Sequence, residues 1–265
     1  MGLSLRYPAV AGQFYPSAPA ELRRAVQFYL GDGPAAQLDG QLKGLIVPHA
    51  GYDYSGPVAG RAFSLLTELD SQAVQRVILL GPSHFASFER ASISLDTAWI
   101  TPLGEAQVDP MARELLSETI IDYPSAHVME HALEVEVPFL QLTLADFTML
   151  PIVCGDVQAV QLATELAPLI EGDTLVIASS DLSHYLPYDA ACAVDRRTCK
   201  LIAALDADGL ARDGEACGRV AILTLLHLAR ELGWQAKLLD YRNSGDTSGI
   251  TSRVVGYAAF AFAST

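Results

Sequence analysis

Three of the six histidines stand where apolar, strand-like runs end, and this placement is the strongest chemical signal in the 265-residue sequence. His49 follows the run LIVP, His84 lies in GPSHF after VILLG, and His184 lies in DLSHY after LVIASS. In open α/β sheets, the loops at the carboxyl ends of the strands converge on a crevice where ligands bind. Imidazole binds zinc, iron, copper and nickel, and it also transfers protons near neutral pH. The pattern therefore predicts a metal-binding or acid–base site at this edge.

A third, anionic ligand is needed for the common open metal site built on two histidines. The sequence pattern alone does not identify it, and the candidates are Asp53, Asp181, Glu134, Glu215 and Cys217. Cys217 is the most distinctive of them, because CGRVA opens a predicted helix and the helix dipole lowers the pKa of a thiol at that position.

The remaining histidines and a serine-rich turn offer weaker alternatives. His127 and His131 lie around a predicted helix start, and His227 falls within the last long helical pattern, where a structural role is expected. The turn that carries His184 also contains Asp181, so a serine hydrolase is the alternative chemistry, with a nucleophile among Ser179, Ser180 and Ser183. This function ranks lowest, because no G-x-S-x-G elbow is present and the residues crowd one turn.

The composition indicates a compartment and excludes some partners. The formal net charge is −14 and the pI is about 4.7, and such a field repels nucleic-acid phosphates and anionic lipid surfaces. No apolar stretch reaches the length of a membrane span, and the first residues, MGLSLRYPAV, lack an apolar signal-peptide core. The four cysteines form no C-x-x-C pair. We therefore expect a cytoplasmic protein with free thiols, which binds neither nucleic acid nor membranes.

Alternating elements must position these residues. Strand-length apolar runs cover 44–47, 77–80, 147–153, 175–178, 236–241 and 254–262, with a more irregular strand over 91–98. Helical patterns cover 19–30, 58–66, 110–116, 133–142, 159–169, 189–205 and 218–232. This alternation predicts an α/β fold in which helices cover both faces of the sheet. Because the stretch Gly31–Gly40 is expected to be a loop and not a domain boundary, we expect one domain over residues 1–265.

Eight segments follow one another in an order that a known family shares. They are RYPAVAGQFYP (6–16), VPHAGYDYSGPVAG (47–60), LLGPSHF (79–85), TPLGEAQVD (101–109), EHALEVEVPFLQ (130–141), ASSDLSHY (178–185), ACGRVAI (216–222) and YRNSGDTSG (241–249). On these segments, which span nearly the whole chain, the sequence resembles the Memo (mediator of cell motility) family. Bacterial members of that family are often called protein B of the AMMECR-Memo-radical-SAM system.

The resemblance implies the fold and cleft of class III extradiol dioxygenases, a three-layer α/β/α domain with a mixed central sheet. It places the metal on His49, His84 and Cys217, with the cysteine at the position of the usual glutamate. His184 matches the acid–base histidine of those enzymes, and Asp181 would lie beside it. The residues that would line or support the cleft are Tyr54, His131 and Glu134.

The same resemblance implies a cofactor, partners and a function. One metal ion is expected, with iron first and copper or zinc as alternatives, because a thiolate is softer and more easily oxidised than a carboxylate. The first function is an oxidoreductase of the extradiol-dioxygenase type, acting on an unknown small molecule. The alternative is a non-enzymatic adaptor that keeps the cleft and binds metal or a peptide there. AMMECR-like and radical-SAM proteins would be its partners.

Overall fold

Four parallel strands form the centre of the molecule, whose computed structural model describes residues 4–31, 38–69 and 73–264. Their order is β8 (Thr148–Cys154), β3 (Arg76–Pro82), β9 (Thr174–Ser179) and β2 (Gln41–Val47). Every residue of these four strands is buried except the first residue of β2, of β3 and of β8. Their runs of Val, Ile and Leu therefore suit a sheet that is covered on both faces. The four predicted strands are confirmed, and their carboxyl ends lie at one edge.

Further strands extend this centre on both sides and make the sheet mixed. β12 (Val254–Ser264) runs antiparallel to β2, and β11 (Trp234–Asn243) and β10 (His184–Leu186) both pair with β12. On the other side, β6 (Gly104–Val108) lies parallel to β8 and is followed by β5 (Ala98–Thr101) and β1 (Leu5–Arg6). The short strands β4 (Ala91–Ile93) and β7 (Ile120–Ile121) join through β8.

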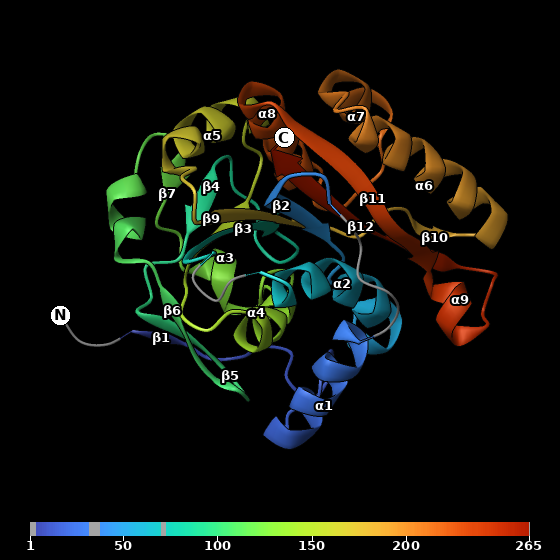
Figure 1. Ribbon diagram of the computed structural model, residues 1–265, viewed down its shortest axis with the longest axis horizontal. Helices are drawn as coiled ribbons and strands as arrows, with labels where there is room; N and C mark the ends of the chain where they lie inside the picture. The colour runs from blue at the N-terminus through green and yellow to red at the C-terminus, as the bar shows by residue number, and fades with distance from the viewer. Residues whose placement is uncertain (1–3, 32–37, 70–72, 265) are drawn as a thin grey trace.

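Helices cover both faces of the sheet (Figure 1). One face carries α1 (Pro19–Leu30), α2 (Tyr52–Thr67) and α4 (Val137–Thr143), and the other carries α5 (Ala159–Leu166), α6 (Tyr188–Ala203), α7 (Ala207–Asp213) and α8 (Arg219–Leu232). Connections contain α3 (Ser125–Val128), α9 (Ser244–Ser248) and 3-10 turns at Pro110–Leu115, Glu134–Glu136 and Ala167–Leu169. The predicted three-layer α/β/α architecture is confirmed. Within residues 4–31, 38–69 and 73–264, no helix combines the length and apolar character that a membrane span requires.

Several element boundaries differ from the prediction for local reasons. The second helix starts at Tyr52, six residues earlier than predicted. Proline usually occurs in the first turn of a helix, so the prediction began directly after Pro57, whereas Pro57 lies inside the helix. The irregular strand predicted over 91–98 is β4 followed, after a break, by the start of β5. The β5–β6 hairpin and α7 were not predicted. Part of the expected loop Gly31–Gly40 falls on residues 32–37, which lie outside the described residues.

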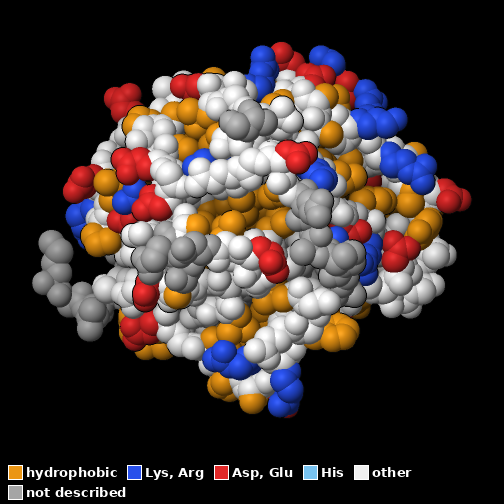
Figure 2. Space-filling model, viewed as in Figure 1, with side chains coloured by type: hydrophobic (Ala, Val, Ile, Leu, Met, Phe, Trp, Pro, Cys, Tyr) orange, Lys and Arg blue, Asp and Glu red, His pale blue; other side chains and the backbone are white. Residues whose placement is uncertain are grey.

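Charged side chains are distributed unevenly over the surface despite the net charge of −14. On the face shown in Figure 2, acidic side chains are scattered, whereas basic ones gather over α6 and α7. The basic residues in these two helices are Arg196, Arg197, Lys200 and Arg212.

A buried ion pair fixes the N-terminal segment. Arg6 Nη1 lies 2.8 Å from Glu134 Oε2, and the two side chains are 4% and 1% exposed. The same carboxylate accepts hydrogen bonds from two backbone N–H groups of the N-terminal segment and from the hydroxyl of Tyr15. Glu134, expected at the cleft, therefore uses its carboxylate to hold the N-terminal segment against the loop that carries His131.

Arg6→Met should lower the free energy of unfolding by about 3–5 kcal/mol, because it leaves the Glu134 carboxylate buried without its cation. Chemical denaturation followed by circular dichroism measures this change. Arg212→Met is the matched control, because Arg212 pairs with Asp213 while 69% of its side chain is exposed, and such pairs contribute at most about 1 kcal/mol. A loss as small as that of the control would show that the buried pair does not stabilise the segment.

Candidate metal centre

Three imidazoles from three separate segments meet at the carboxyl edge of the sheet. His49 follows β2, His84 follows β3, and His131 lies in the loop after α3. One ring nitrogen of each lies within 4.8 Å of the others, and the ring centroids are 5.3, 5.6 and 4.6 Å apart. Metal–nitrogen bonds of about 2.0–2.1 Å place the ring centres of two ligating imidazoles roughly 5 Å apart. The cluster is therefore compatible with binding a single metal ion.

A buried glutamate that the sequence analysis missed orients two of these rings. Glu130 Oε1 lies 2.8 Å from His84 Nδ1 and 3.5 Å from His131 Nδ1. The carboxylate also accepts the backbone N–H groups of His84 (2.6 Å), His131 and Ala132 (both 2.9 Å). Because the Nδ1 proton of His84 is donated to Glu130, the Nε2 lone pair of this ring is free for a metal, as in most metal-binding histidines.

Ser179, at the end of β9, has the corresponding role for His49. Its hydroxyl donates to the carbonyl of Ala132 (2.7 Å), so its oxygen accepts the Nδ1 proton of His49 (2.8 Å). The Nε2 lone pair of His49 then faces Cys217, whose Sγ lies 3.2 Å away. Burial, together with the neighbouring histidines, holds the pKa of His49 well below its usual value, so this ring is neutral at physiological pH.

Cys217 lies beside the cluster in a largely buried setting. Its Sγ accepts the backbone N–H of Asp181 (3.3 Å), and its own N–H donates to the Asp181 carbonyl (3.2 Å). Burial and the carboxylate of Asp181 raise the pKa of the thiol to about 12. The expectation that a helix dipole would lower this pKa is wrong, because α8 begins two residues later, at Arg219, and burial outweighs its dipole. A bound cation would favour the thiolate over the thiol.

Asp181 and His184 occupy different parts of the site. The Asp181 carboxylate accepts the backbone N–H of His49 (2.8 Å), and burial raises its pKa to about 7. His184 is half-buried, and burial lowers its pKa. Within the described part of the chain no hydrogen bond joins Asp181 to His184. Asp181, expected beside His184, therefore holds the loop of His49.

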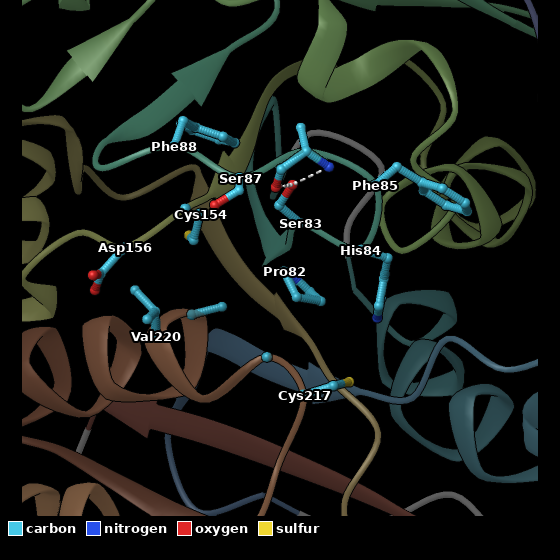
Figure 3. Close-up of a pocket in the computed structure, with 14 residues that line it drawn as sticks. Pro82, Ser83, His84, Phe85, Ser87, Phe88, Cys154, Asp156, Cys217 and Val220 are labelled. Atoms are coloured by element: carbon cyan, nitrogen blue, oxygen red, sulfur yellow. Dashed lines mark hydrogen bonds between the residues drawn. The ribbon is translucent and has the colours of Figure 1, made fainter.

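A cavity of about 550 Å³ opens beside His84 and Cys217 (Figure 3). Its walls come from the loop after β3, the end of β8 and the start of α8, and they include Phe88 and Asp156. Figure 3 shows Asp156 at the end opposite His84 and Cys217. The volume is that of a small-molecule site. Tyr54, expected to line the cleft, lies in the first turn of α2 and is 46% exposed.

The donor set fits a transition-metal ion better than a hard cation such as calcium or magnesium. Neutral imidazoles offer nitrogen lone pairs, and Cys217 offers a sulfur that binds as thiolate. Glu130 and Ser179 hold the rings from behind, as the outer groups of metal sites do. His49 and His84, which the sequence predicted to share one crevice, have ring centroids 5.3 Å apart.

Comparison with a solved structure supports the fold class. The structure of the uncharacterized protein JW3007 from Escherichia coli K12 superimposes with a TM-score of 0.54 at 14% identity, covering 83% of this chain and 99% of that chain. At this identity the likeness concerns the fold alone. The class defined by fold and site is thus an α/β/α protein with a histidine-rich crevice at one sheet edge.

Sequence comparison identifies the family. A model of Memo-like proteins matches residues 6–261. A MEMO1 family protein of Methanopyrus kandleri is 38% identical over 281 residues, covering 97% of this chain and 98% of the relative. Another, of Sulfolobus acidocaldarius, is 40% identical over 286 residues, covering 97% and 99%. The chain belongs to the Memo-like family, which confirms the assignment made from its eight segments.

Glu130→Gln should weaken metal binding about 10- to 100-fold, because the variant loses the charge that fixes the rings of His84 and His131. Competition with a chelator measures the affinity, and circular dichroism checks that the variant is folded. Glu165→Gln is the control, since Glu165 is hydrogen-bonded to Ser117 at the surface. Equal affinities of the two variants would mean that Glu130 does not support a metal site.

Proposed function

We propose that this protein is a metal-dependent oxidoreductase, similar in type to the extradiol dioxygenases, that binds one ion between His49, His84 and Cys217. The observation that supports it most is the 3.2 Å approach of Cys217 Sγ to the free Nε2 of His49, within a cluster of histidine nitrogens beside a cavity. Iron is the ion we favour, with copper and zinc as alternatives, because imidazole and thiolate bind all three. When bound, the ion would supply redox and Lewis-acid chemistry at the cavity wall.

Cys217 is preferred to His131 as the third ligand for two reasons. The ring of His131 is held less firmly, since its Nδ1 lies 3.5 Å from Glu130 whereas that of His84 lies 2.8 Å away. Cys217 Sγ already faces the lone pair of His49, and as a thiolate it would neutralise part of the charge of the ion. His131 remains beside the ion, packed against Phe14 at a centroid distance of 4.7 Å.

His184 is the residue that we assign to proton transfer. Burial lowers its pKa, so the ring is neutral at physiological pH and can accept a proton from a bound substrate. It is close enough to the cluster for an electrostatic influence on His49, yet it belongs to a different strand, β10. Its role is therefore separate from holding the ion.

The cavity would hold a small, uncharged or cationic substrate. Phe85 and Phe88 provide aromatic contact surface, and Asp156 provides a carboxylate at the end remote from the proposed ion. Among the described residues that line the cavity there is no Lys or Arg to bind a phosphate or a carboxylate. A strongly anionic substrate is therefore disfavoured.

A non-enzymatic adaptor that binds metal or a peptide is the second candidate. Exposed aromatic rings beside the cluster favour it: Phe85 is 60% exposed and lies 6.0 Å from His131, and Tyr185 is 62% exposed and lies 5.7 Å from His184. Exposed aromatic rings of this kind could contact a bound peptide. From the family resemblance we propose AMMECR-like and radical-SAM proteins as partners, which co-purification with the tagged chain would test.

Metal affinity should rise about tenfold for each pH unit between pH 7 and 9, because binding displaces the proton of a thiol whose pKa is about 12. The pKa of His49 lies well below its usual value, so this ring releases no proton in that range. Chelator competition at several pH values measures the slope. Cys217→Ala should bind weakly and without this slope, whereas His131→Ala should keep it. A pH-independent affinity in the wild type, with loss of metal in His131→Ala, would contradict the proposed ligand set.

Elemental analysis of the anaerobically purified protein gives the identity of the ion. Metal content and oxygen consumption are then measured for the histidine variants. His49→Ala and His84→Ala should lose the metal, whereas His184→Ala should keep it and lose any oxygen consumption supported by a metabolite extract. An adaptor would bind metal and consume no oxygen in any variant. Loss of metal in His184→Ala would mean that this histidine is a ligand.

A further inference from the structure

A buried carboxylate outside the metal cluster holds the loop that carries His184. Asp195 lies in α6 and is fully buried, with 0% exposure. Its Oδ1 accepts the backbone N–H of Ser183 (3.0 Å), and its Oδ2 accepts the hydroxyl of Tyr241 (2.8 Å). Because Ser183 directly precedes His184, a carboxylate with both oxygens engaged fixes the peptide from which the imidazole projects.

Gly256 in β12 completes the contacts around this peptide. The Gly256 N–H donates to the carbonyl of Ser183 (2.9 Å), and its carbonyl accepts the N–H of Leu182 (2.8 Å). Position 256 requires glycine, since a Cβ there would overlap the Asp195 carboxylate. Leu182 and Ser183 are therefore held from two elements, α6 and β12, immediately before His184.

The backbone on the other side of His184 is strained. Tyr185 has a φ of 60°, in the left-handed region that bulky residues rarely adopt. The pairing of β10 with β12 is irregular at the same point, between His184 and Leu186. Bulges re-aim side chains, and strained residues persist only where the surrounding structure holds them. The hydrogen bonds from Asp195 and Gly256 supply that support.

We propose that Asp195 is a positioning residue for His184, acting through the peptide of Ser183 to direct the imidazole towards the metal cluster. Within the described residues no hydrogen bond joins Asp195 to a proposed ligand, so it acts on the proton-transfer group and not on the ion. The proposal rests on the proposed role of His184 in proton transfer. The orientation of the His184 ring can nevertheless be measured whether or not the protein catalyses a reaction. Asp195, and not the neighbouring Asp181, is thus the carboxylate that holds the peptide before His184.

Nitrogen NMR of histidine-labelled, zinc-loaded protein tests the proposal. In the wild type the ring of His184 should show one protonated and one unprotonated nitrogen, because burial lowers its pKa and the preceding peptide is held by Asp195 and Gly256. His184→Gln assigns the signals. In Asp195→Ala the two tautomers should interconvert and the two signals should average. Asp195→Asn should restore the wild-type pattern, because its oxygen can accept from Ser183 while its amide donates to the Tyr241 oxygen.

Turnover gives a second measurement. Asp195→Ala should lower it about 10²-fold, as expected when a reacting group is misplaced, and zinc content should stay unchanged. Asp195→Asn should recover most of the loss. If the NMR result is obtained but no variant consumes oxygen, the proposed function fails while the role of Asp195 is supported.

Two further variants keep the test decisive. Ser183→Ala changes the residue beside His184 but retains its N–H, and its Oγ is buried without a hydrogen-bond partner among the described residues, so the His184 signals should match the wild type. Tyr241→Phe removes one hydrogen bond to Asp195 without emptying the site, so it replaces Asp195→Ala in the test if that variant does not fold. It should shift the His184 signals in the same direction but by a smaller amount. Wild-type His184 signals in both Asp195→Ala and Tyr241→Phe would overturn the proposal, as would loss of zinc in Asp195→Ala.

Discussion

The burial of the Glu130 carboxylate is the constraint on which the candidate site depends. At 1% exposure it cannot be hydrated, so donors within the protein must satisfy its lone pairs. Those donors are the ring and backbone N–H groups of His84 and the backbone N–H groups of His131 and Ala132. Although burial alone would raise it, the hydrogen bonds from His84 hold the pKa of Glu130 below its usual value. Satisfying one buried charge thus brings two imidazoles together beside His49.

Three other acidic groups beside the cluster are neutralised by protons and not by basic side chains. Burial raises the pKa of Glu136 well above its usual value, that of Asp181 to about 7 and that of Cys217 to about 12. The Ser179 hydroxyl lies 2.9 Å from Glu136 Oε1 and 2.7 Å from the carbonyl of Ala132, and it can donate to either. A divalent ion would replace a proton at Cys217 and leave the rest of this network in place, so the protein should fold with or without the metal.

The sequence predicted the features that follow from periodicity and chain position. The central strands and the placement of His49 and His84 at their ends could be predicted because buried parallel strands are continuous apolar runs that end at one edge. His131 could not be assigned, because it follows no strand and reaches the cluster through a loop. Glu130 and Ser179 were missed, since their roles depend on side-chain hydrogen bonds that have no sequence pattern. The β5–β6 hairpin was missed because its strands are too short to show a clear apolar pattern. The early start of α2 was missed because a proline inside a helix is unusual.

X-ray absorption at the metal edge of the zinc-loaded protein tests most directly whether one ion is shared by His49, His84 and Cys217. Our account predicts one sulfur ligand at about 2.3 Å together with nitrogen ligands at about 2.0–2.1 Å. In Cys217→Ala the sulfur should disappear while the nitrogen ligands remain. A wild-type spectrum with nitrogen and oxygen ligands only, unchanged in Cys217→Ala, would contradict it.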